Sequence, residues 1–229
     1  VSPGAPPPRP RNGAARSVVG ATMRVEVFVD VICPWCYIGA RRLEQALEQF
    51  DHGDEVEVVW RSFELGPSAP PSDESVTTVE HLAASKRMPA EQVLEMVERV
   101  EAVARGEGLE CNLEEAHPGN TFDAHRLLHL ALDRGLQGAL KARLDRASFV
   151  EGVPVSDHEA LASLAVEVGL DEAEVREVLA GDRYAEAVRA DERWAHQQGI
   201  SGVPFFVVDG RYGVSGAQPP AALVGVLER

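Results

Sequence analysis

The sequence has 229 residues, of which 45% are hydrophobic and 26% are charged, enough apolar material for one domain or two closely packed ones. Lys and Arg number 22 against 37 Asp and Glu, and the resulting net charge of −15 opposes binding to nucleic acids or anionic membranes. No apolar run approaches the roughly 20 residues of a membrane span, and the first residues lack the apolar stretch of a signal peptide. We therefore expect a cytoplasmic protein with no nucleic-acid or membrane partner.

Residues 1–22 are rich in Pro, Gly, Ala and Arg and contain no aromatic residue or periodic pattern. Such a segment cannot bury enough apolar area to offset the entropy that it would lose on ordering. We expect it to be a disordered tail. Because Met23 stands directly before the first strand-like segment, a start codon read too far upstream is the alternative.

A β-α-β unit is predicted at the start of the folded chain. From Val25 to Cys33 the residues are β-branched and apolar, which is typical of a strand buried on both faces of a sheet. The segment from Pro34 to Phe50 has apolar residues at helical spacing, with Pro in the first turn, where a helix tolerates it. Residues 55–63 predict a second strand, and residues 66–75 a loop rich in Pro and Ser.

Residues 78–198 are almost wholly helical in pattern, with Gly, Pro and Asp marking short connections. A hairpin that turns at Asp209-Gly210 and a closing helix follow. Because neither end of the chain has a core of its own, the two ends must form one sheet and the helices must be an insertion. We therefore expect an α/β fold whose first part is 23–77, whose helical insertion is 78–198 and whose second part is 199–229.

Two of the three cysteines, Cys33 and Cys36, lie at the predicted junction between strand and helix. Unpaired backbone N–H groups and the helix dipole favour a thiolate at the first of them, so Cys33 is the predicted nucleophile. Cys36, one turn further on the same helical face, is the predicted resolving thiol. Between them, Pro34 stiffens the turn and Trp35 offers an apolar surface beside the sulfur.

Zinc binding and inert burial are the alternatives to redox chemistry for this pair. Half a zinc site would need further ligands at suitable spacing, and the sequence shows no second pair or Cys/His cluster. Two inert buried thiols are not expected at a strand-to-helix junction, because this position favours ionisation of the first thiol. The third cysteine, Cys111, is expected to be a buried free thiol, and a redox role for it is left open.

A second motif, Gly202-Val203-Pro204-Phe205-Phe206, places a proline at the start of a strand. Composition alone favours an ordinary trans peptide before Pro204. A cis peptide, which costs little before proline, would expose the backbone of Val203 to an incoming peptide.

Further candidates are polar. His125 and His129 are spaced so that they could bind a metal from one helical face. The sequence shows no third ligand nearby, so a role in packing or in local hydrogen bonds is favoured for both. Asp30 and Glu26, on the first strand, are candidate proton-handling carboxylates if they are buried. An exposed surface role is equally open for Glu26.

Several segments, taken together, resemble the DsbA-like oxidoreductases and, within them, the FrnE-like branch. The resemblance runs from about Met23 to the end of the chain. The segments are D-V-I-C-P-W-C-Y-I-G at 30–39, W-R-S-F-E-L at 60–65, N-T-F-D-A-H-R-L at 120–127, G-I-S-G-V-P-F-F-V at 199–207 and Y-G-V-S-G-A-Q at 212–218.

This resemblance implies a thioredoxin-like fold with a helical insertion, a cis-proline at Pro204 facing the cysteine pair, and disulfide exchange as the activity. It also implies that Asn120, His125 and Arg126 shape the substrate site. The second cysteine pair that some FrnE-like proteins carry is absent, so activities that depend on it are not expected. Isomerases of 2-hydroxychromene-2-carboxylate and kappa-class glutathione transferases share the fold but typically have Ser where this chain has Cys33, which favours redox chemistry here.

The leading hypothesis is a cytoplasmic thiol-disulfide oxidoreductase working in the reductase or isomerase direction on protein or small-molecule disulfides and thiols. In it Val203 and Pro204 orient the substrate, no cofactor or metal is needed, glutathione is a conceivable co-substrate, and the protein is a monomer or a homodimer. One alternative is a glutathione-dependent isomerase or transferase in which Ser215, Gly216 and Gln218 hold the tripeptide. The other is a redox-independent holdase whose cleft grips unfolded chains.

Overall fold

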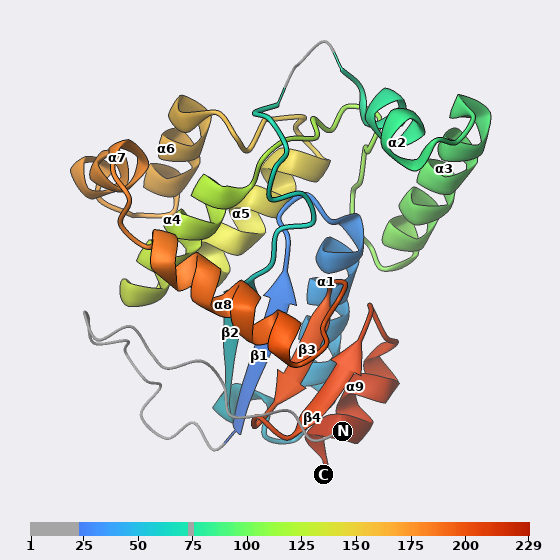
Figure 1. Ribbon diagram of the computed structural model, residues 1–229. Coiled ribbons are helices and arrows are strands. Elements are labelled where there is room, and N and C mark those ends of the chain that lie inside the picture. Colours follow the sequence, from blue (N-terminus) through green and yellow to red (C-terminus); the bar gives the residue numbers. More distant parts are fainter. Residues whose placement is uncertain (1–22, 73–75) are drawn as a thin grey trace.

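The computed structural model describes residues 23–72 and 76–229, so the predicted tail at 1–22 lies outside the described residues. Its centre is a mixed four-stranded sheet in the order β2-β1-β3-β4 (Figure 1). The strands are β1 (Met23–Val29), β2 (Val56–Ser62), β3 (Phe205–Val208) and β4 (Tyr212–Ser215). β1 pairs in parallel with β2 and antiparallel with β3, and β3 and β4 form the predicted hairpin. The two ends of the chain therefore build one sheet.

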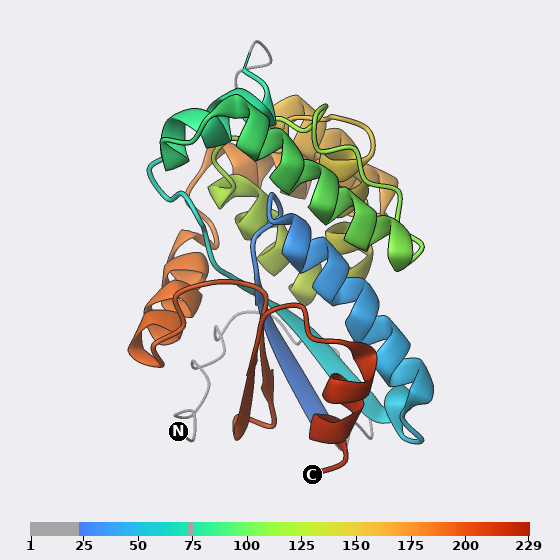
Figure 2. The ribbon, with the colours of Figure 1, turned by 90° about the vertical axis from the view of Figure 1, so that its right-hand side faces the viewer.

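Helix α1 (Pro34–Gln49) connects β1 to β2, and α9 (Pro220–Leu227) closes the chain as predicted. These two helices pack against one face of the sheet, and α8 (Ala185–Gln197) covers the other (Figures 1 and 2). The helices between β2 and β3 are α2 (Thr78–Lys86), α3 (Ala90–Gly106), α4 (Phe122–Asp133), α5 (Gln137–Phe149), α6 (His158–Glu167), α7 (Glu172–Ala180) and α8 (Ala185–Gln197). This is an α/β architecture with inserted helices; the division of the chain into domains at the predicted boundaries stays a prediction.

Strand β1 is buried on both faces, as its sequence predicts. Val25, Val27 and Val29 pack in the cluster shared with α1 and α9. On the other face Phe28 stacks on Trp194 of α8, with the ring centroids 5.1 Å apart. Such alternation follows from the two-residue period of a strand.

The strand ends earlier than predicted, at Val29 rather than near Cys33. The apolar residues that follow form a turn, because the backbone N–H of Cys33 donates to the carbonyl of Asp30 at 3.2 Å. This turn makes Cys33 the N-cap of α1.

A buried charge network ties the second face of the sheet to the inserted helices. Arg61 Nε donates to Glu26 Oε1 at 2.8 Å, and Arg61 Nη1 donates to Asp191 Oδ1 at 3.3 Å. Asp191 Oδ2 accepts from the backbone N–H of Ser62 at 3.0 Å, and His129 Nε2 lies 3.2 Å from it. The surface role left open for Glu26 is therefore wrong, and His129 takes part in hydrogen bonds as favoured.

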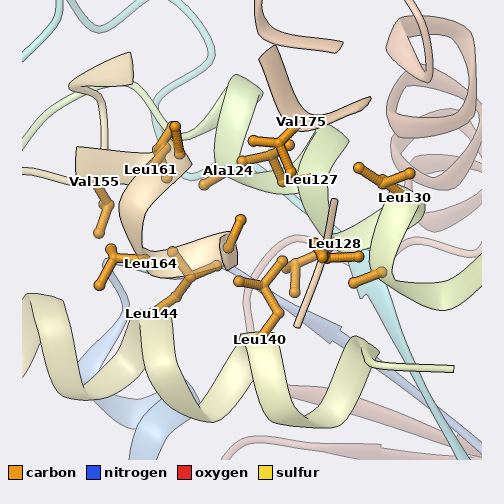
Figure 3. Close-up of a cluster of buried hydrophobic side chains, with 14 of the residues drawn as sticks. Ala124, Leu127, Leu128, Leu130, Leu140, Leu144, Val155, Leu161, Leu164 and Val175 are labelled. Carbon is orange, nitrogen blue, oxygen red and sulfur yellow. The ribbon is translucent and has the colours of Figure 1, made fainter. Parts of the chain in front are cut away.

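The inserted helices have an apolar core of their own (Figure 3). Its fully buried residues come mainly from α4, α5 and α6 and include Leu127, Leu130, Leu140, Leu144 and Leu161. Asp157 caps α6 and Asp171 caps α7, each by accepting from a backbone N–H in the first turn of its helix. This core also includes Val31, so it reaches the turn that follows β1. Of the described residues, none lies in a helix that is both long and apolar enough to cross a membrane.

Strand β2 is at the edge of the sheet, and a side chain of α5 forms hydrogen bonds with its outer backbone groups. Gln137 Nε2 donates to the carbonyl of Trp60 at 2.9 Å, and Gln137 Oε1 accepts from the N–H of Trp60 at 3.0 Å. The amide thus replaces a neighbouring strand at this residue. Beside it, Lys141 Nζ lies 5.1 Å from the centre of the Trp60 ring and forms a buried ion pair with Asp145.

Candidate active site

The two cysteines stand at the start of α1, as predicted. Cys33 is the N-cap and Pro34 begins the helix, while Cys36 lies in the first turn. The backbone N–H of Cys36 donates to the carbonyl of Cys33 at 2.9 Å, which sets the pair on one side of the helix. Both thiols are free, and Cys33 keeps 5% of its surface exposed whereas Cys36 is fully buried.

The environment makes the two thiols unequal. The hydrogen bond from the Cys36 side chain lowers the pKa of Cys33, helped by the backbone N–H groups of Cys36 and Trp35 and opposed by burial and by the charge of Asp30. For Cys36, burial first, and then its hydrogen bond to Cys33 and the charge there, hold the pKa well above the ordinary value. The more accessible sulfur is therefore the one that ionises first.

This difference predicts a distinct pH profile for alkylation of Cys33 by iodoacetamide. Only the thiolate reacts, so the rate should be level at high pH and fall as the pH drops through the lowered pKa of Cys33. Cys111 is a control within the same chain, because burial raises its pKa to about 11 and its rate should still be rising at pH 10. Mass-spectrometric mapping of the alkylated peptides separates the two sites. If the midpoint of the Cys33 pH profile lay at or above that of free cysteine, the lowered pKa of Cys33 would be contradicted.

The segment before β3 faces the first thiol. The Val203-Pro204 peptide is cis, as the resemblance implies, so the trans peptide favoured by composition is wrong. Cys33 Sγ donates to the carbonyl of Val203 at 3.6 Å. On the other side, a Cβ added to Gly39 of α1 would lie 2.8 Å from Pro204 Cγ, so this glycine is what allows the proline ring to approach the helix.

Near the cysteines, the buried carboxylate of Asp30 lies beside the imidazole of His125. Asp30 Oδ2 accepts from the backbone N–H of Leu65 at 2.7 Å. Asp30 Oδ1 lies 3.4 Å from His125 Nε2, and both side chains have no exposed surface. Within residues 23–72 and 76–229, neither that oxygen nor either ring nitrogen of His125 has a hydrogen-bond partner. His125 thus contacts Asp30 from the interior side.

The other predicted substrate-binding side chains make contacts within the protein. Asn120 Nδ2 donates to Glu64 Oε1 at 3.4 Å, and its Oδ1 accepts from the N–H of Phe122 at 3.0 Å. Buried Arg126 donates to backbone carbonyls in 178–183, beyond and at the end of α7. Gln218 is exposed and donates to the carbonyl of Ser215 at 2.8 Å. Their roles toward a substrate stay predictions.

A cavity of about 690 Å³ opens beside Cys33. One wall is the segment 32–35, in which Trp35 is 41% exposed, and Leu65, 51% exposed, lies at the same wall. The facing wall comes from α2, from α3 and from residues 113–119. The sequence does not predict this wall: the apolar stripe of α3 is visible in it, but a stripe does not say what it faces.

The described ranges contain no group of three or more His, Cys, Asp or Glu side chains that could hold a metal ion. Cys111 is half-buried and free, and its neighbours are apolar residues of the cluster around α3 rather than the cysteine pair. The site therefore consists of two thiols, the Val203 carbonyl, a buried carboxylate and an apolar cavity.

The model of the DSBA-like thioredoxin domain family matches residues 24–228. Among curated proteins, the uncharacterized protein YwbO of Bacillus subtilis is 29% identical over 189 residues, which cover 82% of this chain and 87% of that protein.

Solved structures give the same fold. The crystal structure of the probable DsbA oxidoreductase from Streptomyces coelicolor superposes with a TM-score of 0.83 at 47% identity, covering 90% of this chain and 88% of that one. The cytosolic disulfide reductase DsbM from Pseudomonas aeruginosa, solved with GSH, gives a TM-score of 0.60 at 20% identity over 90% of this chain and all of that one, a likeness of fold alone. The predicted thioredoxin-like fold is thus confirmed.

Proposed function

The chain belongs to the family of DSBA-like thioredoxin domains, and from that premise we propose that it is a thiol-disulfide oxidoreductase that works through Cys33 and Cys36. The observation that carries this proposal is the pairing, at the start of α1, of a sulfur with a lowered pKa that lines the cavity and a fully buried sulfur with a raised pKa. The 3.6 Å contact of Cys33 with the Val203 carbonyl supports it, because that carbonyl lies where an incoming chain would meet the sulfur.

Reduction of a substrate disulfide proceeds in two exchanges. The Cys33 thiolate attacks one substrate sulfur, a Cys33–substrate disulfide forms, and the other substrate sulfur leaves as a thiolate. Cys36 then loses its proton and attacks Cys33 Sγ, which closes the Cys33–Cys36 disulfide and releases the second substrate thiolate. Both released thiolates take up protons, so the substrate gains two electrons and two protons in all.

The second exchange needs a base, because burial raises the pKa of Cys36. Asp30 is the group that we assign to this role. Its carboxylate is close enough to raise the pKa of Cys33, and Oδ1 lacks a hydrogen-bond partner within the described chain. His125 Nε2 lies 3.4 Å from that oxygen.

The finer assignment is to the FrnE-like branch, supported by the segments at 30–39 and 120–127. Because a reducing cytoplasm keeps most dithiols reduced, we assign the reductase or isomerase direction, on protein or small-molecule disulfides. Glutathione is the thiol class that would return the oxidised pair to the dithiol in that compartment.

The test is the reduction potential of the pair. The protein is equilibrated in buffers of reduced and oxidised glutathione, and the fraction of dithiol is counted by thiol labelling and mass spectrometry, beside an insulin-reduction assay. One two-electron transition together with insulin reduction supports the proposal. The absence of any exchangeable disulfide would overturn it and favour the glutathione-dependent isomerase, and suppression of aggregation that survives loss of both thiols would favour the holdase.

A further inference from the structure

The cavity beside Cys33 has the size of a small-molecule site. Its volume is about 690 Å³, within the roughly 300 to 1,000 Å³ of sites that enclose drug-sized ligands. Cys33 itself belongs to the wall, together with Ile32, Pro34 and Trp35. A ligand held here therefore lies next to the reactive sulfur.

The lining of this cavity differs in charge from the rest of the chain. None of the described residues that line it is Asp or Glu, although the sequence contains 37 of them. The groups of its lining that can carry positive charge are Lys86, at the end of α2, and the imidazoles of His81 and His117. An anion that the net charge of −15 repels elsewhere meets no carboxylate in this wall.

The interior of the cavity is apolar. Its apolar lining includes Met96, Val97 and Val100 of α3, with Leu113 and Phe149. Two hydroxyls in the lining already donate within the protein: Thr78 Oγ1 to the Ala116 carbonyl at 2.6 Å and Ser85 Oγ to the Leu82 carbonyl at 3.3 Å. A polypeptide backbone would bring polar groups that such a wall leaves unsatisfied, whereas an aromatic or aliphatic group would not.

We propose that the cavity binds a small organic disulfide in which one half is an aromatic or aliphatic group that bears a carboxylate. The hydrophobic part of this half lies in the cavity, its carboxylate lies toward Lys86, and its disulfide sulfur lies at Cys33. This inference rests on the proposed function and names its substrate class. The Cys33 thiolate attacks the sulfur of the bound half, and the other half leaves as a thiolate. Attack of Cys36 on Cys33 Sγ then releases the bound half as a second thiolate, so one disulfide is reduced to two thiols and the protein dithiol is oxidised.

The experiment compares matched disulfides with the fully reduced full-length chain. The probes are 4,4′-dithiodibenzoate, its neutral diamide 4,4′-dithiobis(benzamide), and the compact hydroxyethyl disulfide. Each second-order rate constant is divided by that of free cysteine thiolate with the same probe, which removes differences between leaving groups. The normalised rate should be highest for the dithiodibenzoate, in spite of the negative charge of the protein.

Two variants locate the effect. Lys86→Gln should lower the preference for the carboxylate over the diamide about two- to fivefold, the range of one exposed charge pair. Arg211→Gln, which changes the net charge equally on the exposed hairpin turn, should not. Met96→Trp, which fills the cavity, should lower the rate with both aromatic probes relative to hydroxyethyl disulfide about tenfold, whereas Val166→Trp, on the exposed face of α6, should leave that ratio unchanged.

The outcomes separate this inference from the proposed function. Reaction with hydroxyethyl disulfide but no preference for the dithiodibenzoate overturns the inference and leaves the oxidoreductase standing. The same follows if Met96→Trp loses insulin reduction as strongly as it loses the aromatic probe, since the cavity then serves polypeptides. Failure to react with any disulfide overturns the proposed function and this inference with it.

Discussion

Replacing Cys33 with Ser is expected to lower disulfide exchange by at least about a thousandfold, because a hydroxyl is not ionised near neutral pH and forms no S–S bond. The loss should be the same for insulin and for small disulfides, since both would react with Cys33, the one sulfur of the pair that keeps any exposed surface. The measurement is the initial rate of each reaction with the purified variant, beside circular dichroism to show that the fold is kept.

Cys36→Ser is the matched control for this change. The Cys33 thiolate can still attack, but the mixed disulfide cannot be resolved, so the variant should accumulate a covalent adduct of one substrate half on Cys33 that intact mass spectrometry detects. Activity that survives in Cys33→Ser, or an adduct that forms on Cys111 instead, would show that the pair is not the reactive centre.

The second large effect is on stability. Arg61→Leu removes the cation that pairs with two buried carboxylates, Glu26 and Asp191, while Asp191 keeps its contacts with the Ser62 N–H and His129. Breaking a buried ion pair from one side in this way typically lowers the free energy of unfolding by about 3 to 5 kcal/mol. Urea unfolding followed by tryptophan fluorescence measures it, and Trp194, packed on the same face of the sheet, reports on that region.

The control for that prediction is Arg176→Leu, which removes an arginine whose ion pairs with Glu159 and Glu172 are at the surface. Water screens those charges, so the urea midpoint should hardly move. If Arg61→Leu also leaves the midpoint in place, the two carboxylates do not depend on Arg61, and α8 is held to the sheet by its apolar contacts instead.

The sequence predicts the ends of the chain well because local rules operate there. Pro34 is tolerated in a first turn, and α1 begins with it. Asp209 and Gly210 have φ angles of 49° and 64°, which is the backbone that a two-residue hairpin turn requires, and the turn lies where the Asp-Gly pair predicted it. The end of β1 was harder to predict, because Val31 and Ile32 are apolar whether they extend a strand or form a turn.

The site depends more on contacts between distant segments, and these leave weaker signals. Arg126 belongs to a segment that resembles a substrate site, yet its guanidinium binds carbonyls of the segment 178–183, and nothing in the spacing of the chain indicates that contact. The same holds for the Asp30–His125 contact and for the wall that α2 and α3 contribute to the cavity. Both arise because the insertion folds back over the end of the sheet.

The pairing of β1 with both β2 and β3 also sets the order in which the site is completed during synthesis. The cysteines, α1 and β2 emerge early, whereas the strand that covers the second edge of β1 lies near the end of the chain. A ribosome adds about 5 to 20 residues per second, so a nascent chain carries both thiols for seconds before Val203 and Pro204 exist. During that interval β1 has an open edge and the Cys33 thiol has no carbonyl facing it. A chain that stops before residue 203 thus holds the cysteine pair without the carbonyl that faces Cys33 in the folded protein.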